Sequence, residues 1–212
     1  MSATEDPAAE TADDFPAAPP LPWRLDGSAR LGVFTLAQPM EAPSTVTAVA
    51  ARRLLVFANS YRGGDVSYDA LGVATLARHR HRVAVVPRHL WVDDPSIRRA
   101  GREQASTPSD PGSFAWSDSS ARIASGQASV ELSWHVRTRL ALPMPMTFTY
   151  FVWDDGRLGC IPIPGRATGS PITMRINHWP DHFPELAAYE SSLALRLNFA
   201  MTVRPQRLID SK

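Results

Sequence analysis

The chain of 212 residues contains one cysteine, one lysine and no long hydrophobic run. A single cysteine, Cys160, excludes an internal disulfide and fits a reducing cytoplasm. The single lysine, Lys212, stands at the very end, which excludes chemistry through an interior lysine amine such as Schiff-base formation. No apolar stretch approaches the roughly 20 residues of a membrane span, and no basic-then-apolar leader opens the chain. We therefore expect a cytoplasmic protein.

Charge is balanced, with 22 basic and 21 acidic residues. No dense run of basic side chains offers a surface to nucleic acid or to an anionic membrane, so we expect neither partner. His178 and His182 are four residues apart, but Pro180 between them breaks the helix that such a metal-binding pair requires. The sequence therefore predicts no metal site, and we expect no cofactor.

The chain divides into two regions by composition. Residues 1–20 are rich in Ala, Pro, Asp, Glu and Thr, and such a segment buries too little apolar surface to offset its ordering entropy, so we predict disorder. Apolar residues make up 44% of the whole chain, enough for a sizeable core. We predict one domain over residues 21–212.

Short apolar runs alternate with turn signals, a pattern typical of β strands. The predicted strands are Arg30–Leu36, Leu54–Ala58, Gly72–Leu76, Arg82–Val86, Arg122–Gln127, Val130–Val136 and Met146–Val152. Asp155 and Gly156 predict a tight hairpin after the last of these strands. Trp134 and His135 must lie on opposite faces of their strand, and the alternation leaves open which of them points inward.

Helical signals are few. Asp94–Arg102 is the best helix, started by Asp94-Pro95 and with Ile97 facing inward. Ser44–Val49 is a short helix or a turn, and alternation within Ala187–Ala200 favours a strand there over a helix. Nineteen prolines also favour a loop-rich, mostly antiparallel β architecture over a helical bundle.

Four segments, in the same order and at similar spacing, resemble segments of the acetoacetate decarboxylases. Pro22–Gly27 is similar to the opening Pro-Pro-Trp-x-Leu-x-Gly of that family, and Ser67–Leu71 is similar to its Gly-Pro-Tyr-x-Glu-Leu. Leu90–Glu103 is similar to Val-Asp-Ser-x-x-Ser followed by a short helix and Gly-Arg-Glu. Ser113–Trp116 is similar to the family's Phe-x-Trp. The resemblance implies a mostly β (α+β) fold, a closed antiparallel β-barrel with flanking strands and a few short helices. It also implies an apolar cavity and a homo-oligomer.

The resemblance fails at the residues that carry the family's reaction. Ser109 and Asp110 stand where the family has two lysines, one of which forms a Schiff base with the substrate ketone. Two acidic positions of the family are replaced as well, by Ala70 and in the neighbourhood of Leu55. The sequence therefore predicts a cavity that has lost Schiff-base chemistry.

The retained polar residues are the candidates for catalysis. By resemblance Glu103 points into the cavity, where burial would raise the pKa of its carboxyl group and suit it to acid–base work. The alternatives are a structural pair with Arg102 and a carboxylate that accepts hydrogen bonds from backbone amides. The Tyr68 hydroxyl, with Arg102, is a candidate to polarise a substrate carbonyl, or else Tyr68 is a barrel aromatic with its hydroxyl at the surface. Ser109 is a candidate to bind substrate, or else a nucleophile or a plain loop residue. Asp110 is a candidate to bind substrate or to transfer protons, or else a turn residue.

Three further residues are candidates to line the cavity: Trp116, His135 and Phe148. The alternatives are barrel core for the two aromatic residues and a solvent-facing position for His135. We hypothesise an enzyme of a bacterial biosynthetic pathway that acts on a small ketone, β-keto acid or polyketide-like compound by cyclisation, dehydration, isomerisation or an aldol-type step. The competing hypotheses are a non-catalytic protein that binds an apolar carbonyl ligand, and a pseudoenzyme.

Overall fold

The computed structural model describes residues 17–107, 109–138 and 140–209. This part of the chain forms thirteen strands and one helix. In chain order they are β1 (Trp23–Leu36), β2 (Thr47–Val49), β3 (Arg53–Gly64), β4 (Tyr68–His79), β5 (Arg82–Val92), α1 (Pro95–Ala105), β6 (Asp110–Pro111), β7 (Ser113–Trp116), β8 (Ser120–Ser125), β9 (Ala128–Val136), β10 (Leu142–Asp154), β11 (Arg157–His178), β12 (Leu186–Val203) and β13 (Arg207–Leu208).

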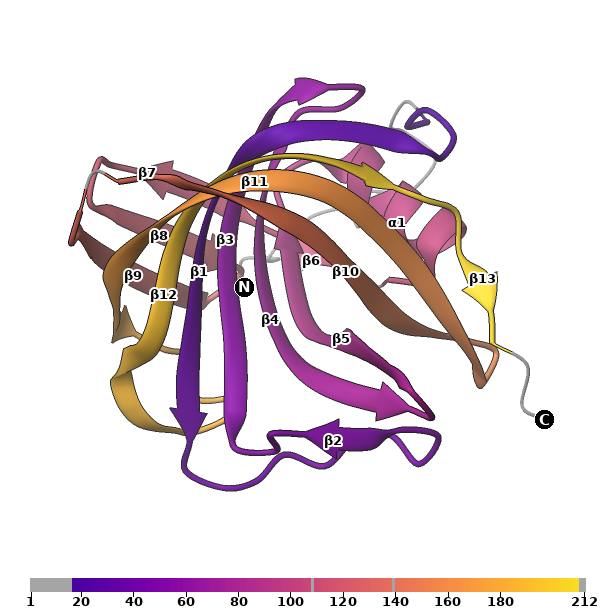
Figure 1. The fold of residues 1–212 in the computed structure, drawn as a ribbon, viewed down its shortest axis with the longest axis horizontal. Coiled ribbons are helices and arrows are strands. Elements are labelled where there is room, and N and C mark those ends of the chain that lie inside the picture. Colours follow the sequence, from indigo (N-terminus) through magenta and orange to yellow (C-terminus); the bar gives the residue numbers. More distant parts are fainter. Residues whose placement is uncertain (1–16, 108, 139, 210–212) are drawn as a thin grey trace, which may run out of the picture.

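The strands follow the order β10-β5-β4-β3-β1-β12-β11-β9-β8-β7. Three short strands lie outside this order: β2 pairs with β4, β6 pairs with β5, and β13 pairs with β11. Strand β10 also pairs with β11, antiparallel along its whole length, whereas it meets β5 through a single parallel pair, Tyr150 and Val85. Figure 1 shows β7, β8 and β9 on one side of the molecule and α1 near the other. The long strand β11 joins the two parts, because its first part pairs with β10 and β12 and its last part pairs with β9.

The mostly β character expected from the sequence is confirmed. Asp155 and Gly156 form the predicted hairpin between β10 and β11, and both have positive φ, as a type I′ two-residue turn requires. The ambiguous segment near residues 187–200 is strand β12. Ser44 and Thr45 form a turn and not a helix, and β2 follows them. Of the segment predicted to be disordered, residues 1–20, residues 1–16 lie outside the described residues.

The one helix of the described residues begins close to its predicted start. Asp94 is its N-cap, and the Asp94 side chain accepts a hydrogen bond from the backbone N–H of Ile97 at 3.0 Å. Pro95 occupies the first turn, where its missing N–H costs nothing. Ile97 and Ala100 are buried against the sheet, so the opposite face of α1 is turned to solvent. No helix in the described ranges is long and apolar enough to cross a membrane.

Two large groups of buried side chains hold the fold together. The first lies between the strands β7–β9 and the main sheet and includes Phe34, Trp134 and Met174. The second is surrounded by β1, β3, β4, β5, β10, β11 and β12 and includes residues of α1. This second group is incompletely filled, and the space within it is the candidate site.

Candidate functional site

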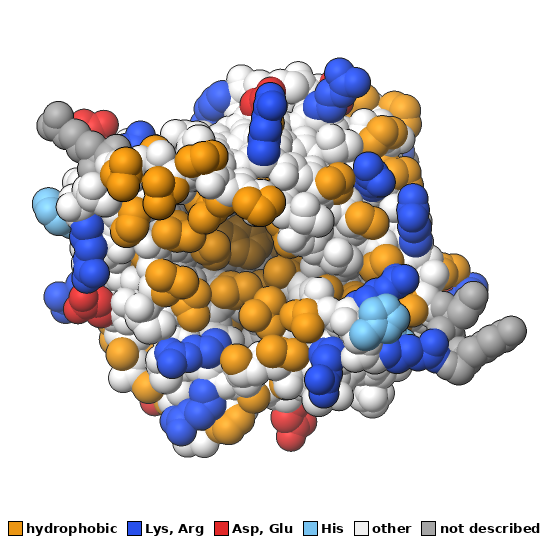
Figure 2. Space-filling view, in the orientation of Figure 1, with side chains coloured by type: hydrophobic (Ala, Val, Ile, Leu, Met, Phe, Trp, Pro, Cys, Tyr) orange, Lys and Arg blue, Asp and Glu red, His pale blue; other side chains and the backbone are white. Residues whose placement is uncertain are grey.

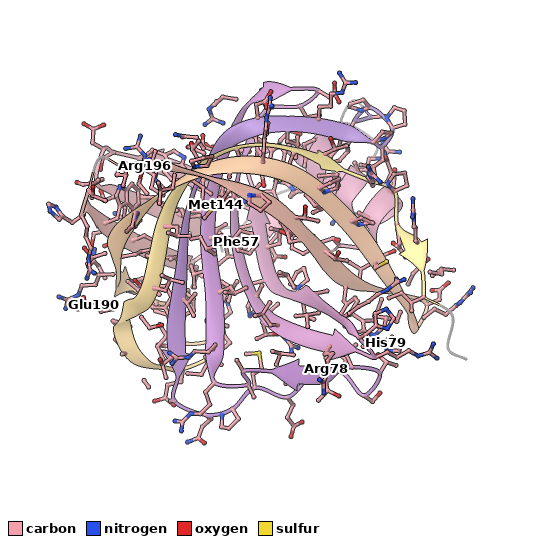
Figure 3. All side chains as sticks on the ribbon, in the orientation of Figure 1. Phe57, Arg78, His79, Met144, Glu190 and Arg196 are labelled. Carbon is pink, nitrogen blue, oxygen red and sulfur yellow. The ribbon has the colours of Figure 1, made fainter. Side chains whose placement is uncertain are left out.

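An apolar cavity opens into the second buried group. Its outer compartment has a volume of about 250 Å³ and its inner compartment about 90 Å³. The two compartments adjoin, since both are lined by Phe57, Asn59, Tyr61, Tyr150 and Met201. Figure 2 shows a hollow walled by hydrophobic side chains, and Figure 3 places Phe57 and Met144, which both line the outer compartment, in the same part of the view.

Strand periodicity explains which side chains face the cavity. Phe57, Asn59 and Tyr61 are two residues apart on β3, so they project from the same face of the sheet. Their partners on β4 are Gly72, Ala70 and Tyr68 in that order. The aromatic ring of Phe57 lies where a Cβ atom of Gly72 would be, at a distance of 2.0 Å from that position. Glycine at this position therefore leaves room for the Phe57 ring between the compartments.

Three of the four tyrosines of the chain meet at this cavity. Tyr61 and Tyr68 are stacked, with ring centroids 4.3 Å apart, and Tyr150 lines the same compartment. The Asn59 side-chain amide donates a hydrogen bond of 2.9 Å to the Tyr61 hydroxyl. Burial is the largest cause of a raised pKa in all three tyrosines. They are consequently neutral hydrogen-bonding groups at physiological pH.

Two smaller hydroxyl groups complete the polar end of the cavity. Thr107 and Ser109, which follow α1, are both buried and line the inner compartment. Thr107 is fixed by two hydrogen bonds: its N–H donates to the Gly101 carbonyl at 2.9 Å, and its hydroxyl donates to the Ala105 carbonyl at 2.8 Å. The inner end thus offers hydroxyl and amide groups, whereas the outer compartment is lined almost wholly by aliphatic, methionine and aromatic side chains.

Neither a protein-family profile nor a curated protein matches the sequence. Solved structures do match. Acetoacetate decarboxylase from Legionella pneumophila has a TM-score of 0.69 at 12% identity, over 99% of this chain and 98% of that chain. The enduracididine biosynthesis enzyme MppR has a TM-score of 0.65 at 13% identity, over 91% and 89%. An acetoacetate decarboxylase-like enzyme from Sphingomonas wittichii RW1 has a TM-score of 0.59 at 12% identity, over 90% and 94%.

The fold is that of acetoacetate decarboxylase. At these identities the similarity concerns the fold, and the residues of the cavity must be judged on their own chemistry. None of the described residues that line the cavity is a lysine, and the single lysine of the sequence, Lys212, lies outside the described residues.

Three of the predicted site residues do line the cavity. Tyr68 and Ser109 lie in the inner compartment, and Phe148 lies in the outer one. Tyr68 is half-buried, stacks on Tyr61 and lines the inner compartment. The structure thereby brings together residues that are up to 80 positions apart in sequence.

Glu103 and Arg102 lie on the solvent side of α1. The expectation that Glu103 points into the acetoacetate decarboxylase-like cavity is not met: its side chain is 56% exposed and pairs with Arg99, at 2.8 Å from Glu103 Oε1 to Arg99 Nε. The alternative pair with Arg102 is also replaced by this pair with Arg99. The helix phase is the reason, since Ile97, Gly101 and Ala105, the residues of α1 that line the inner compartment, lie on the other side of the helix from Glu103.

Asp110, Trp116 and His135 are likewise not among the lining residues. Asp110 is exposed on β6, and His135 is exposed on β9 because its neighbour Trp134 takes the buried face. Trp116 packs against the first buried group, and its indole N–H donates to Asp69 Oδ2 at 3.0 Å. The open question of Trp134 or His135 is therefore settled in favour of Trp134, which packs in the core and does not line the cavity.

Sequence reasoning missed four polar residues of the site: Asn59, Tyr61, Thr107 and Tyr150. The signal for two of them was present, since Phe57, Asn59 and Tyr61 alternate with Ala58 and Ser60 at strand spacing. In the described part of the chain no three His, Cys, Asp or Glu side chains gather in a way that could hold a metal ion.

Proposed function

We propose that this chain is a lysine-independent, acetoacetate decarboxylase-like enzyme that binds a small ketone or polyketide-like compound in the cavity between its strands. We further propose that the seven strands from β10 through β5, β4, β3, β1 and β12 to β11 form a closed barrel around the ligand. The observation that carries the proposal is the convergence of Tyr61, Tyr68 and Tyr150 at the inner end of an otherwise apolar cavity.

The tyrosine hydroxyl groups give the cavity its chemical role. Because burial keeps them protonated, they are donors to a carbonyl oxygen and stabilise the negative charge that grows on that oxygen when an enol or enolate forms. Tyr61 is held by Asn59, so its hydroxyl group is oriented before a ligand binds. A carbonyl group placed among these hydroxyls is therefore activated as an electrophile.

The reaction that suits such a site is one in which the substrate supplies its own nucleophile. In an aldol-type cyclisation the substrate first moves a proton from an α-carbon to the neighbouring carbonyl oxygen and so becomes the enol. The enol carbon then bonds to a second carbonyl carbon of the same molecule, and the oxygen of that second carbonyl becomes a hydroxyl. The enol oxygen loses one proton and the new hydroxyl gains one. A tyrosine hydroxyl relays this proton: it donates its own proton to the new hydroxyl and accepts the proton of the enol oxygen. No atoms are added, and a dry cavity prevents water from competing.

A second function, binding without catalysis, is favoured by one observation. Among the described lining residues none carries a carboxylate, imidazole or amine that would act as a general base near neutral pH. Glu103, the base expected from the sequence, has no part in this proposal because it is turned to solvent. The expected homo-oligomer and cytoplasmic location stay predictions.

The test is to incubate the protein with a neutral straight-chain diketone whose two carbonyl carbons are four positions apart in the chain, and to follow formation of the cyclic aldol product. The wild-type protein is expected to accelerate cyclisation, and Tyr68→Phe to lose most of the acceleration. Tyr189→Phe is the matched control, because Tyr189 is exposed on β12 away from the cavity. Binding without acceleration would favour the second function, and no binding would refute both.

A further inference from the structure

The described residues that line the cavity carry no formal charge. The polar side chains among its described lining residues are those of Asn59, Tyr61, Tyr68, Thr107, Ser109 and Tyr150. The raised pKa of the three tyrosines keeps them neutral. An ionised ligand group at the inner end would consequently lose its hydration without gaining a counter-ion.

Two arginines, Arg30 on β1 and Arg62 on β3, project away from the cavity. Arg62 follows Tyr61 on β3 and so projects from the opposite face, where it forms an ion pair with Asp69 at 2.7 Å. Arg30 also projects away from the cavity, since its guanidinium group lies over the rings of Trp116 and Trp134. The nearby Asp93 accepts a hydrogen bond from the Asp69 N–H at 2.8 Å. Neither arginine is therefore available to neutralise an anion inside.

The shape of the cavity gives it a direction. The inner compartment is the smaller, about 90 Å³, and is lined by all five hydroxyl groups, whereas the outer one, about 250 Å³, is mostly apolar and shares with it only the polar groups of Asn59, Tyr61 and Tyr150. Phe57 lines both compartments at their junction. A ligand that matches this pattern has a compact polar head and an extended hydrocarbon chain.

Building on the proposed function, we infer that the cavity selects uncharged, elongated carbonyl compounds and rejects the corresponding carboxylates. The carbonyl head lies among Tyr61, Tyr68 and Tyr150, and the hydrocarbon chain runs past Phe57 towards Met146 and Phe148. A free β-keto acid is thus excluded as a substrate, whereas a methyl ketone or an ester of the same length is accepted.

The experiment compares three ligands of equal chain length with the wild-type protein by isothermal titration calorimetry at pH 7.5: a methyl ketone, a fatty acid carboxylate and the methyl ester of that acid. The ketone and the ester are expected to bind, and the carboxylate is expected to bind at least about a hundredfold more weakly, because an unpaired buried ion costs several kcal/mol. The ester isolates the effect of charge, since it differs from the carboxylate by one methyl group.

Two variants report where the ligand lies. Tyr68→Phe is expected to weaken the ketone and the ester by about tenfold, the value of one buried hydrogen bond, while Tyr189→Phe leaves both unchanged. Met146→Trp, which fills the outer compartment, is expected to weaken the long ketone while leaving a four-carbon ketone unaffected. A normal thermal unfolding transition of each variant shows that it is folded.

The outcomes separate the two claims. Carboxylate binding as tight as that of the ester overturns the selection for uncharged ligands but leaves the proposed carbonyl site intact. A carboxylate bound with its chain inward and its charge at the rim would give that same result and would be insensitive to Tyr68→Phe. Failure of all three ligands to bind overturns the proposed function and this inference together.

Discussion

Tyr61 and Tyr68 face each other directly across β3 and β4, with their rings stacked at a centroid distance of 4.3 Å. The two hydroxyl groups nevertheless differ in their partners, because the Tyr61 hydroxyl accepts a hydrogen bond from the buried Asn59 amide and the Tyr68 hydroxyl does not. Tyr61→Phe leaves that amide donor without its acceptor, so we expect a loss of about 1–3 kcal/mol in the free energy of unfolding. Urea denaturation measures it, and Tyr61→Phe/Asn59→Leu, which removes both partners, should recover part of the loss.

Gly72 provides a second test, at the junction of the two compartments. Gly72→Ala would place a methyl group against the Phe57 ring, so we expect a destabilisation of about 1–3 kcal/mol and a changed cavity. The double variant Gly72→Ala/Phe57→Leu should be more stable than the sum of the two single variants predicts. Additive free energies in this double-mutant cycle would show that the ring and the glycine are not coupled.

The N-cap of α1 supports the segment that reaches Thr107 and Ser109. Asp94→Ala removes the acceptor of the Ile97 N–H, and we expect a loss of about 1 kcal/mol. Asp94→Asn retains a capping oxygen and should keep nearly all of the stability. Equal losses for both variants, measured by chemical denaturation, would mean that the charge and not the cap is what matters.

Glu103 is expected to be dispensable for ligand binding. Its pair with Arg99 is an exposed pair four residues apart on a helix, so Glu103→Gln should change the free energy of unfolding by less than about 0.5 kcal/mol. Calorimetric affinity for a neutral ketone should be unchanged. A large loss of affinity or turnover would restore Glu103 as an acid–base candidate and would require α1 to rotate when the ligand binds.

His89 predicts a pH dependence of stability. It stacks on Phe183 with a centroid distance of 4.1 Å, and burial, together with His182 and Arg88, lowers its pKa against an opposing effect of Asp110. The folded state therefore resists protonation of His89, so stability is lost as pH falls through the unfolded-state pKa of about 6.5. Unfolding free energies between pH 7.5 and 5 should fall less steeply for His89→Gln than for the wild-type protein.

Local patterns in the sequence were sufficient to predict the strands, the Asp155–Gly156 turn and the start of α1, since turn residues and caps act within a few positions. Which face of a strand is buried was harder to predict, because one residue of register exchanges the faces. Trp134 lies opposite the buried Met174 of β11, a partner 40 positions away that alternation within β9 does not identify.

The candidate site was predicted only in part for the same reason. Tyr68 and Ser109 were found through resemblance, whereas Tyr150 joins them only because β10 lies beside β5. Glu103 was the opposite case, a residue whose position could be predicted locally. It is two residues from Gly101 and two from Ala105, which both line the inner compartment, and with about 3.6 residues per turn a step of two residues leads to the opposite side of the helix.

The two sides of β10 are held unequally, by a continuous ladder to β11 and by one pair, Tyr150 and Val85, to β5. Backbone amides on the β5 side have few partners to lose, so we expect them to exchange with deuterium sooner than those on the β11 side. Both residues of that pair line the outer compartment. A small separation there would widen the cavity while leaving the rest of the sheet undisturbed, and this seam would then set the rate at which a ligand enters and leaves.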